Sequence, residues 1–145
     1  MVKVLIKKLN PIVKIPEYKT DGSSGMDLKA FINKPINVKP KTSSLVPTGL
    51  SVAFSEDYEI QIRPRSGLAA KENISVLNTP GTIDSDYRGE IKIILFNHGK
   101  DEFIINNNDR IAQMILVPIL KAEFEEVKSL PKTLRGSGGF GSTGK

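Results

Sequence analysis

The chain contains no cysteine and no tryptophan, and it has a single histidine, His98. Without cysteine, disulfide bonds and thiolate metal sites are unavailable, which fits a reducing compartment. One histidine cannot form a cluster, so a multi-histidine metal site or a histidine-bearing catalytic triad is poorly supported. His98 lies in the string Asn97-His98-Gly99-Lys100, which is typical of a solvated turn. Any metal is therefore expected to be hard, oxygen-bound and brought in by a phosphate ligand.

Long apolar runs are also missing. No run approaches the roughly 20 residues that a membrane-spanning helix needs, and residues 1–8 lack the apolar core of a signal peptide. We therefore expect a cytoplasmic protein without membrane contact. The formal net charge of +5 favours anionic partners. Because the basic residues are scattered and aromatics are few, nucleotide or phosphate binding fits better than nucleic-acid binding.

The 145 residues are enough for one domain with a sizeable core. Nine prolines, spread evenly, leave little room for long helices. Short strand-like segments separated by turn residues favour an all-β sandwich, jelly roll or barrel. The expected strands are residues 2–9, 45–54 (interrupted at 47–49), 58–62, 74–77, 90–97, 103–105, 110–117 and 122–127.

One short helix is expected over residues 67–72, with Ser66 placed to cap it. A helix N-terminus offers unpaired N–H groups to an anion. The alternative is an ordinary capped turn without a ligand.

The segment from Gly81 to Glu90, Gly-Thr-Ile-Asp-Ser-Asp-Tyr-Arg-Gly-Glu, combines two carboxylates, an arginine and an aromatic between glycines. If the segment is extended, Asp84, Asp86 and Arg88 share one face. Such a cluster suggests a site, whereas a solvated hairpin tip would use the same residues for turn geometry. The segment alone leaves both interpretations open.

The C-terminal string from Arg135 to Gly144 holds five glycines, two serines, a threonine and Phe140. Its composition is typical of a flexible tail or linker. A linker, however, has no use for Arg135 and Phe140. Glycine N–H groups, hydroxyls and an arginine suit the wrapping of phosphates, and an aromatic ring could stack on a base.

Five segments stand in order along the chain: Ser24-Gly-Met-Asp-Leu-Lys-Ala30, Pro64-Arg-Ser-Gly-Leu-Ala69, Asn78 with the Gly81–Glu90 decapeptide, Asp109-Arg-Ile-Ala-Gln-Met114, and the tail from Arg135 to Gly144. Together they resemble the motifs of the trimeric deoxyuridine triphosphate nucleotidohydrolases (dUTPases). Ser24, where the family commonly has alanine, is the one departure.

The resemblance implies a jelly-roll-like (β-clip) subunit in a homotrimer, with active sites shared between subunits. Motifs one, two and four would come from one chain, motif three from a second and the tail from the third. Residues 1–134 would form a single β domain, and residues 135–145 a flexible tail that closes over the site.

The activity implied is hydrolysis of dUTP to dUMP and pyrophosphate, which limits uracil in DNA and supplies dUMP for dTTP synthesis. Asp84 would be the general base that activates water for attack on the α-phosphorus. Mg²⁺ would bind the triphosphate, and Asp27 would accept a hydrogen bond from one of its waters. The phosphates would contact Arg65, Ser66, Gly67, Gln113, Arg135, Gly141, Ser142 and Thr143.

The resemblance also assigns specificity. The hairpin from Asn78 to Lys92, with Thr82 and Ile83, would read uracil mainly through backbone groups. Tyr87 would pack against the deoxyribose and leave no room for a 2′-hydroxyl, and Phe140 would lie over the uracil. Two neighbouring pairs are expected to be structural: Asp86 with Arg88, and Asp109 with Arg110.

Three other functions stay open at this stage. A dCTP deaminase would share the fold and trimer, but it usually has a glutamate where Asp84 stands. A nucleic-acid-binding β-barrel is suggested only by the basic charge. A catalytically silent jelly-roll scaffold would not need the complete set of motifs.

Overall fold

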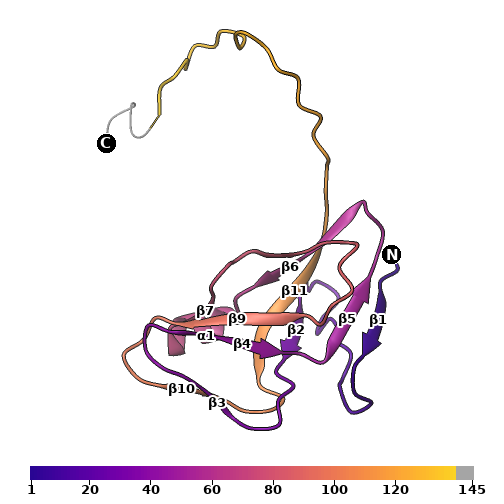
Figure 1. Ribbon diagram of the computed structural model, residues 1–145, viewed down its shortest axis with the longest axis vertical. Coiled ribbons are helices and arrows are strands. Elements are labelled where there is room, and N and C mark those ends of the chain that lie inside the picture. The colour runs from indigo at the N-terminus through magenta and orange to yellow at the C-terminus, as the bar shows by residue number, and fades with distance from the viewer. Residues whose placement is uncertain (140–145) are drawn as a thin grey trace.

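The computed structural model describes residues 1–139 and shows an almost entirely β protein with one short helix. The prediction of an all-β fold is confirmed. Figure 1 shows the strands gathered in one body, from which the chain after the last strand arcs away. The elements are β1 (Leu5–Lys8), β2 (Met26–Lys29), β3 (Ile36–Val38), β4 (Ser43–Pro47), β5 (Leu50–Ala53), β6 (Tyr58–Arg63), α1 (Ser66–Glu72), β7 (Ile74–Val76), β8 (Gly81–Ile83), β9 (Lys92–Asn97), β10 (Phe103–Ile105) and β11 (Arg110–Pro118).

All strand pairings are antiparallel, and the two largest sheets carry the architecture. One has four strands in the order β2-β11-β6-β8, and the other has three in the order β4-β9-β7. Two further pairs, β1-β5 and β10-β3, complete the body. Because neighbours in a sheet are distant in sequence, segments carrying different motifs come to lie side by side.

The core lies where the sheets turn their apolar sides inward. Along β6 the alternation is clean: Ile60 and Ile62 are buried, whereas Glu59, Gln61 and Arg63 face outward. Period-two alternation of this kind is what a sheet with one buried face requires. Buried residues of the other sheet, Val46, Ile93 and Leu95 among them, belong to the same core.

The predicted strands match closely where they have partners. Segments 45–54, 58–62, 74–77, 90–97, 103–105 and 110–117 are found. Of the predicted strand 2–9 only residues 5–8 form β1, and the break predicted at 47–49 is the turn at Thr48-Gly49 between β4 and β5. Gly49 has φ +70°, a conformation that favours glycine. The strands β2, β3 and β8 were not predicted, because their local sequence signals are weak and pairing with β11, β10 and β6 forms them.

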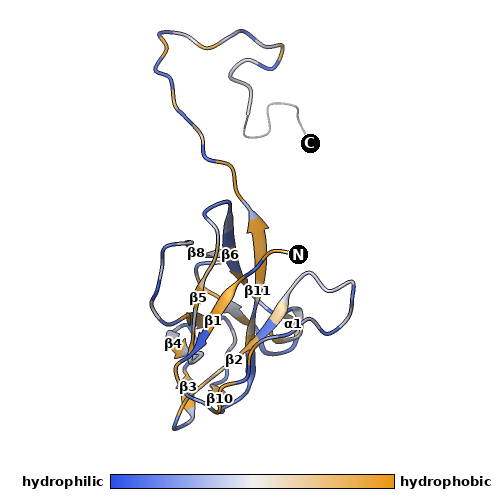
Figure 2. Ribbon diagram, turned by 90° about the vertical axis from the view of Figure 1, so that its right-hand side faces the viewer, coloured by the Kyte–Doolittle hydropathy of each residue, from blue (hydrophilic) through white to orange (hydrophobic). Residues whose placement is uncertain are grey.

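Two local predictions were wrong. Residues 122–127 form no strand: Phe124 is 93% exposed, and no neighbouring strand offers its backbone a hydrogen-bonded partner within the described subunit. Figure 2 shows hydrophobic and hydrophilic residues alternating along this arm, beyond the mainly hydrophobic β11. Ser66 does not cap the helix either. It is the first helical residue, and Arg65 holds the N-cap position with an extended backbone and no side-chain cap.

Across the described part of the chain, no helix is long and apolar enough to cross a membrane. His98, predicted to be a solvated turn residue, is exposed and follows β9 directly. Its ring contacts Phe96 and its Nε2 lies 2.8 Å from Ser75 Oγ, so it helps to close the end of the three-stranded sheet.

Candidate active site

Asp27, Gln113 and Arg63 form one row across three neighbouring strands. Gln113 of β11 is opposite Asp27 of β2 on one side and opposite Arg63 of β6 on the other. Directly opposed residues project from the same face of a sheet. Their neighbours Leu28 and Ile62 are buried in the core, so the three polar side chains lie on the outer face of the four-stranded sheet.

The Asp27 carboxylate joins two arginines from different motifs. Its Oδ1 accepts from Arg65 Nε at 2.8 Å, and its Oδ2 accepts from Arg110 Nη1 at 3.4 Å. Arg65 also donates to the carbonyl of Arg110 at 3.3 Å. The Asp27 and Arg65 side chains are only 20% and 23% exposed, so the ion pair is better shielded from solvent than an ordinary surface pair. The first, second and fourth motifs therefore meet at one carboxylate.

Gln113 links the fourth motif to the second, and Gly25 makes room for it. Gln113 Nε2 donates to the carbonyl of Pro64 at 2.9 Å. A Cβ at Gly25 would lie 2.6 Å from Gln113 Oε1 and 3.2 Å from Ile115. The first-motif glycine thus permits a close approach that a larger side chain would obstruct.

Ser66 and Gly67 begin α1 directly after Arg65, and both are exposed. No heavy atom would contact a Cβ at Gly67 within 4 Å, so the space beside it is open. The predicted phosphate residues Arg65, Ser66, Gly67 and Gln113 thus lie around the C-terminal end of β6, where Arg63 is opposite Gln113 of β11.

The third motif forms a strand followed by a tight turn. β8 pairs with β6, and a hydrogen bond from Tyr87 N to Asp84 O at 3.1 Å closes the turn. The segment is therefore not extended beyond Ile83, and the shared face expected for Asp84, Asp86 and Arg88 is not formed. Asp84 is exposed at the start of this turn.

Other predicted residues of the hairpin are placed around β8. Asn78 lies close over Gly81, where an added Cβ would be 3.1 Å from Asn78 Nδ2. Thr82 is exposed and Ile83 is half-buried. Lys92, exposed at the start of β9, lies 3.8 Å from Glu90.

The two expected structural pairs are formed differently. Arg88 donates to the backbone carbonyls of Ser85 and Tyr87, and it makes no ion pair with Asp86 in the described structure. Asp109 accepts from Asn106 N at 2.7 Å, as a turn residue should. Arg110 instead reaches Asp27, because β11 lies next to β2 in the sheet.

Within one subunit, Asp84 lies far from the row formed by Asp27, Gln113 and Arg63. Ile83 is opposite Ile60, whereas Gln113 is opposite Arg63, three residues further along β6. Ordinary strand dimensions then separate Ile83 from Gln113 by roughly 14 Å. Asp84 continues in the direction of Glu59, away from Arg63. One subunit therefore does not bring the predicted base to the predicted phosphate residues.

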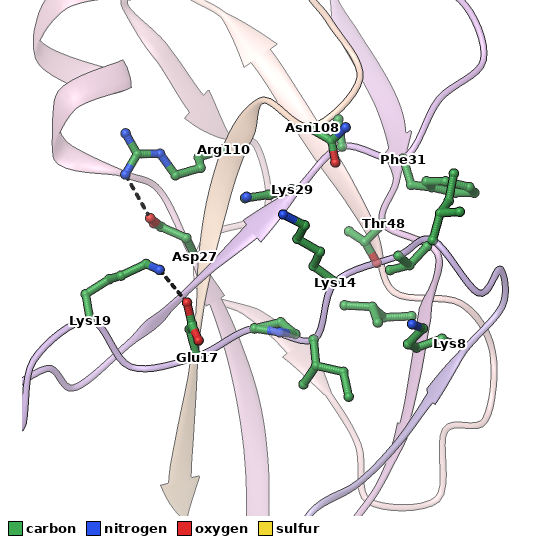
Figure 3. A pocket seen from close by; sticks show the side chains of 16 residues that line it. Lys8, Lys14, Glu17, Lys19, Asp27, Lys29, Phe31, Thr48, Asn108 and Arg110 are labelled. Carbon is green, nitrogen blue, oxygen red and sulfur yellow. Dashed lines mark hydrogen bonds and ion pairs between the residues drawn. The ribbon is translucent and has the colours of Figure 1, made fainter.

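A cavity of about 650 Å³ opens beside Asp27 and Arg110. Figure 3 shows Lys14 and Lys29 extending toward it, and the Arg110–Asp27 contact at its edge. Lys19 pairs with Glu17 at 2.7 Å, and this hydrogen bond holds the pKa of the Glu17 carboxyl below its ordinary value. The lysines that line the cavity make the surface beside Asp27 positively charged.

The donor set agrees with a metal that keeps its own waters. Within residues 1–139 no three His, Cys, Asp or Glu side chains cluster as metal ligands. Asp27 is the only carboxylate in the row of Asp27, Gln113 and Arg63. Each of its oxygens already accepts one arginine N–H. A carboxylate oxygen can accept more than one hydrogen bond, so these residues fit a hydrated Mg²⁺ that binds chiefly to phosphates.

The tail is described only as far as Gly139. Arg135 is exposed and donates to the carbonyl of Gly138 at 2.8 Å, which closes a local turn. The arm leaves the body after the C-terminal end of β11 (Figure 1), whereas the row of Asp27, Gln113 and Arg63 crosses β11 nearer to its start. The predicted residues Phe140, Gly141, Ser142 and Thr143 lie outside the described residues.

Two residues of the site region were not predicted. Arg63 lies in the row and donates twice to Gln61 Oε1, at 3.0 and 2.6 Å. Gln61 and Arg63 stand on either side of the apolar Ile62, and this alternation could have indicated that Arg63 faces outward. Arg110 stands in the fourth motif but was expected to pair with Asp109; its actual partner Asp27 is distant in sequence and is brought next to it only by strand pairing.

Comparisons with known proteins agree with this arrangement. The dUTPase family model matches residues 12–144. The deoxyuridine 5′-triphosphate nucleotidohydrolase of Rickettsia bellii (strain OSU 85-389) is 54% identical, over 99% of this chain and 97% of the relative. That of Rickettsia conorii (strain ATCC VR-613 / Malish 7) is also 54% identical, over 99% and 98%.

Solved structures show the same fold at low sequence identity. A mutant dUTPase of Staphylococcus bacteriophage 80alpha with dUpNHpp has a TM-score of 0.83 at 22% identity, covering 99% of both chains. A second mutant of that enzyme reaches 0.86 at 23% identity, covering 97% of this chain and 98% of the other. These likenesses support the jelly-roll-like fold. With a family model that spans nearly all of the sequence and relatives that match it from end to end, the chain belongs to the dUTPase family.

Proposed function

We propose that this protein hydrolyses dUTP to dUMP and pyrophosphate, limiting uracil incorporation into DNA and supplying dUMP for dTTP synthesis. The observation that carries the proposal is the meeting of three motifs at Asp27, with Arg65, Ser66 and Gln113 beside it. Relatives that are 54% identical along their whole length bear the corresponding name. The arrangement suits phosphoryl transfer, in which positioning and charge neutralisation supply most of the catalysis.

On this proposal the phosphates bind around the C-terminal end of β6, beside Gln113 of β11. Arg65 brings a positive charge whose orientation is fixed by Asp27. Ser66 and Gly67 offer a hydroxyl and N–H groups, and Gln113 offers a neutral amide. Asp84, exposed on its turn, takes a proton from the water that attacks the α-phosphorus.

Mg²⁺ is part of the proposal, and its role is to neutralise charge on the phosphate oxygens. Asp27 would hold it through a water molecule. A dUTPase of phage phi11, with a TM-score of 0.80 at 20% identity, is described with a structural Mg(II) ion. Binding of the ion through water, rather than directly, is supported by the hydrogen bonds that both Asp27 oxygens already accept from arginines.

Base and sugar specificity are assigned to the hairpin. The backbone around Thr82 and Ile83, with Asn78 and Lys92, reads uracil. Mismatched donors of cytosine would be buried unpaired, which is a strong basis for rejection. Tyr87 excludes the 2′-hydroxyl of a ribonucleotide.

The separation inside one subunit supports a homotrimer with shared active sites. Because Asp84 lies far from Gln113 in its own chain, a site that uses both would take one of them from a second copy. The tail of a third copy would then close the site with Arg135, Phe140, Gly141, Ser142 and Thr143. The domain of residues 1–134, the mobile tail of residues 135–145 and a cytoplasmic location belong to the same proposal.

Subunit complementation tests this function and its geometry together. Asp84→Asn and Gln113→Ala subunits, each expected to be nearly inactive alone, are unfolded, mixed in equal amounts and refolded. If the base and the phosphate-binding residues come from different copies, about a quarter of all sites in the randomly reassembled trimers hold both intact groups. Pyrophosphate release from dUTP should recover toward that fraction. No recovery would place both groups in one chain.

Substrate comparison separates the remaining functions. With Mg²⁺, pyrophosphate release should be much faster from dUTP than from dTTP, dCTP or UTP. Ammonia release from dCTP would instead indicate the deaminase reaction. Tight, salt-dependent binding to single strands would indicate a nucleic-acid-binding barrel.

A further inference from the structure

We propose that Glu90 is the positioning residue that fixes Tyr87 and so sets discrimination against ribonucleotides. The inference rests on the proposed function, in which Tyr87 faces the sugar. It concerns a residue that contacts no substrate in that proposal. Glu90 acts through its side chain on the protein body and through its backbone on the tyrosine.

The side chain of Glu90 anchors the end of the hairpin to a distant turn. Its Oε1 accepts from Gly49 N at 2.8 Å, across 41 residues of sequence. The Glu90 side chain is only 21% exposed, and Oε2 lies 3.8 Å from the Lys92 ammonium. A charged acceptor at a part-buried N–H makes a stronger hydrogen bond than a neutral pair.

The Gly49 turn is a rigid anchor. Its φ is +70°, and an added Cβ would lie 2.7 Å from Val13 Cγ2. Its carbonyl accepts from Leu9 N at 2.8 Å, so both polar groups of the Gly49 backbone are engaged. Beside it, Thr48 Oγ1 donates to Ile91 O at 2.7 Å. The residue after Glu90 is therefore held by the same turn.

The backbone of Glu90 in turn holds the tyrosine. Tyr87 Oη donates to Glu90 O at 3.0 Å. The ring passes so close to Gly89 that an added Cβ there would overlap its hydroxyl end. Tyr87 is 44% exposed, so little packing fixes its ring apart from these contacts. A continuous chain of contacts thus runs from Gly49 through Glu90 to Tyr87.

To exclude a 2′-hydroxyl, the Tyr87 ring must stay in place when a ribonucleotide binds. If the Glu90 anchor is lost, the hairpin end can shift, and small displacements at a binding surface change reaction rates strongly. The expected effect is a greater tolerance for UTP rather than a uniform loss of activity.

The test compares kcat/KM for dUTP and UTP in four single variants and one double variant of the full-length protein. Glu90→Gln keeps the Oε1 acceptor, and Glu90→Ala removes it. Tyr87→Phe removes the hydroxyl donor. Glu56→Ala is the control, because Glu56 is another lysine-paired glutamate, but its side chain is exposed and makes no hydrogen bond to the Gly49 turn in the described structure.

We expect Glu90→Ala and Tyr87→Phe each to lower the dUTP-to-UTP ratio about ten-fold, the effect of losing one hydrogen bond. Glu90→Gln and Glu56→Ala should keep the ratio near that of the wild type. In the double variant Glu90→Ala/Tyr87→Phe the ratio should fall little below that of either single variant, since both act on one chain of contacts. Parallel losses for both substrates, or fully additive losses, would overturn the inference.

A measurement without substrate separates this inference from the proposed function. By NMR, amide exchange at Gly49 should accelerate and the Tyr87 ring signals should shift in Glu90→Ala, but not in Glu90→Gln. If Glu90→Ala folds poorly, Glu90→Asp, whose carboxylate is one methylene shorter, replaces it with the same expectation. Unchanged Gly49 and Tyr87 signals would overturn the positioning role, whereas failure to hydrolyse dUTP in the wild type would overturn the function alone.

Discussion

Asp27 Oδ1 accepts the Nε–H of Arg65 at 2.8 Å, so an ion pair joins the first and second motifs within one subunit. Arg110 approaches the other oxygen of the same carboxylate at 3.4 Å. The carboxylate therefore organises two guanidinium groups on the outer face of the sheet, where the phosphates are proposed to bind.

Asp27→Asn should raise KM for dUTP and lower kcat/KM by roughly ten- to a hundred-fold. The asparagine amide can still accept a hydrogen bond from Arg65, but it lacks the negative charge that holds the guanidinium in place. Removing one partner of this part-buried pair should also cost about 1–3 kcal/mol of unfolding free energy. Steady-state kinetics and thermal unfolding measure both effects. Asp57→Asn, at an exposed carboxylate bonded to Ser55, is the control. An unchanged kcat/KM would show that Asp27 does not organise the site.

Gly25→Ala should reduce activity more than stability. The new Cβ would lie 2.6 Å from Gln113 Oε1, and the end of a flexible side chain can move away. Gln113 would then lose its bond to Pro64 O and its orientation toward phosphate. Gly22→Ala is the matched control, because a Cβ there meets nothing within 4 Å. Equal kinetics for the two variants would contradict the role given to Gly25.

Asp84→Asn should abolish most turnover while leaving nucleotide binding intact, since an amide cannot accept the proton of the attacking water. General base catalysis typically contributes about 10²–10⁴-fold, and we expect a loss of that size in kcat. Binding of a non-hydrolysable dUTP analogue, measured by calorimetry, should change little. Asp86→Asn serves as the comparison, and near-normal turnover in Asp84→Asn would remove the base assignment.

Truncation after Leu134 should leave the β body folded and severely reduce dUTP hydrolysis. The last strand of the described residues ends at Pro118, and none of the described residues of the lost segment, 135–139, belongs to the hydrophobic core. Thermal unfolding should be unchanged within about 0.5 kcal/mol, as for other changes away from the core. Full activity in the truncated protein would mean that the tail is a linker.

Asn97→Ala should destabilise the fold by about 2–4 kcal/mol, since it would leave buried polar groups unpaired. Asn97 is 1% exposed; it donates to Val38 O and Asp101 O and accepts from Gly99 N. Denaturant unfolding measures the loss. Asn106→Ala, at an exposed asparagine, should change stability little, and equal losses would contradict this account.

Most strands could be predicted because their apolar residues alternate and have partners in the same subunit. The 58–62 segment is the clearest example, with Ile60 and Ile62 inward. The 122–127 segment shows why such a prediction fails: a strand pattern without a neighbouring strand forms no ladder. The short β2 and β8 were missed for the opposite reason, since pairing with β11 and β6 forms them despite weak local signals.

The sequence by itself determined the family, because its motifs occur in order at specific residues. It also determined the residue types available for the chemistry, a carboxylate base among them. Only the tertiary structure decided that Asp27 faces Arg65 and Arg110, that Glu90 holds Gly49, and that Asp84 lies away from Gln113. Those relations depend on strand order and register, which join residues tens of positions apart, whereas a local pattern determines only which face of its own strand is buried.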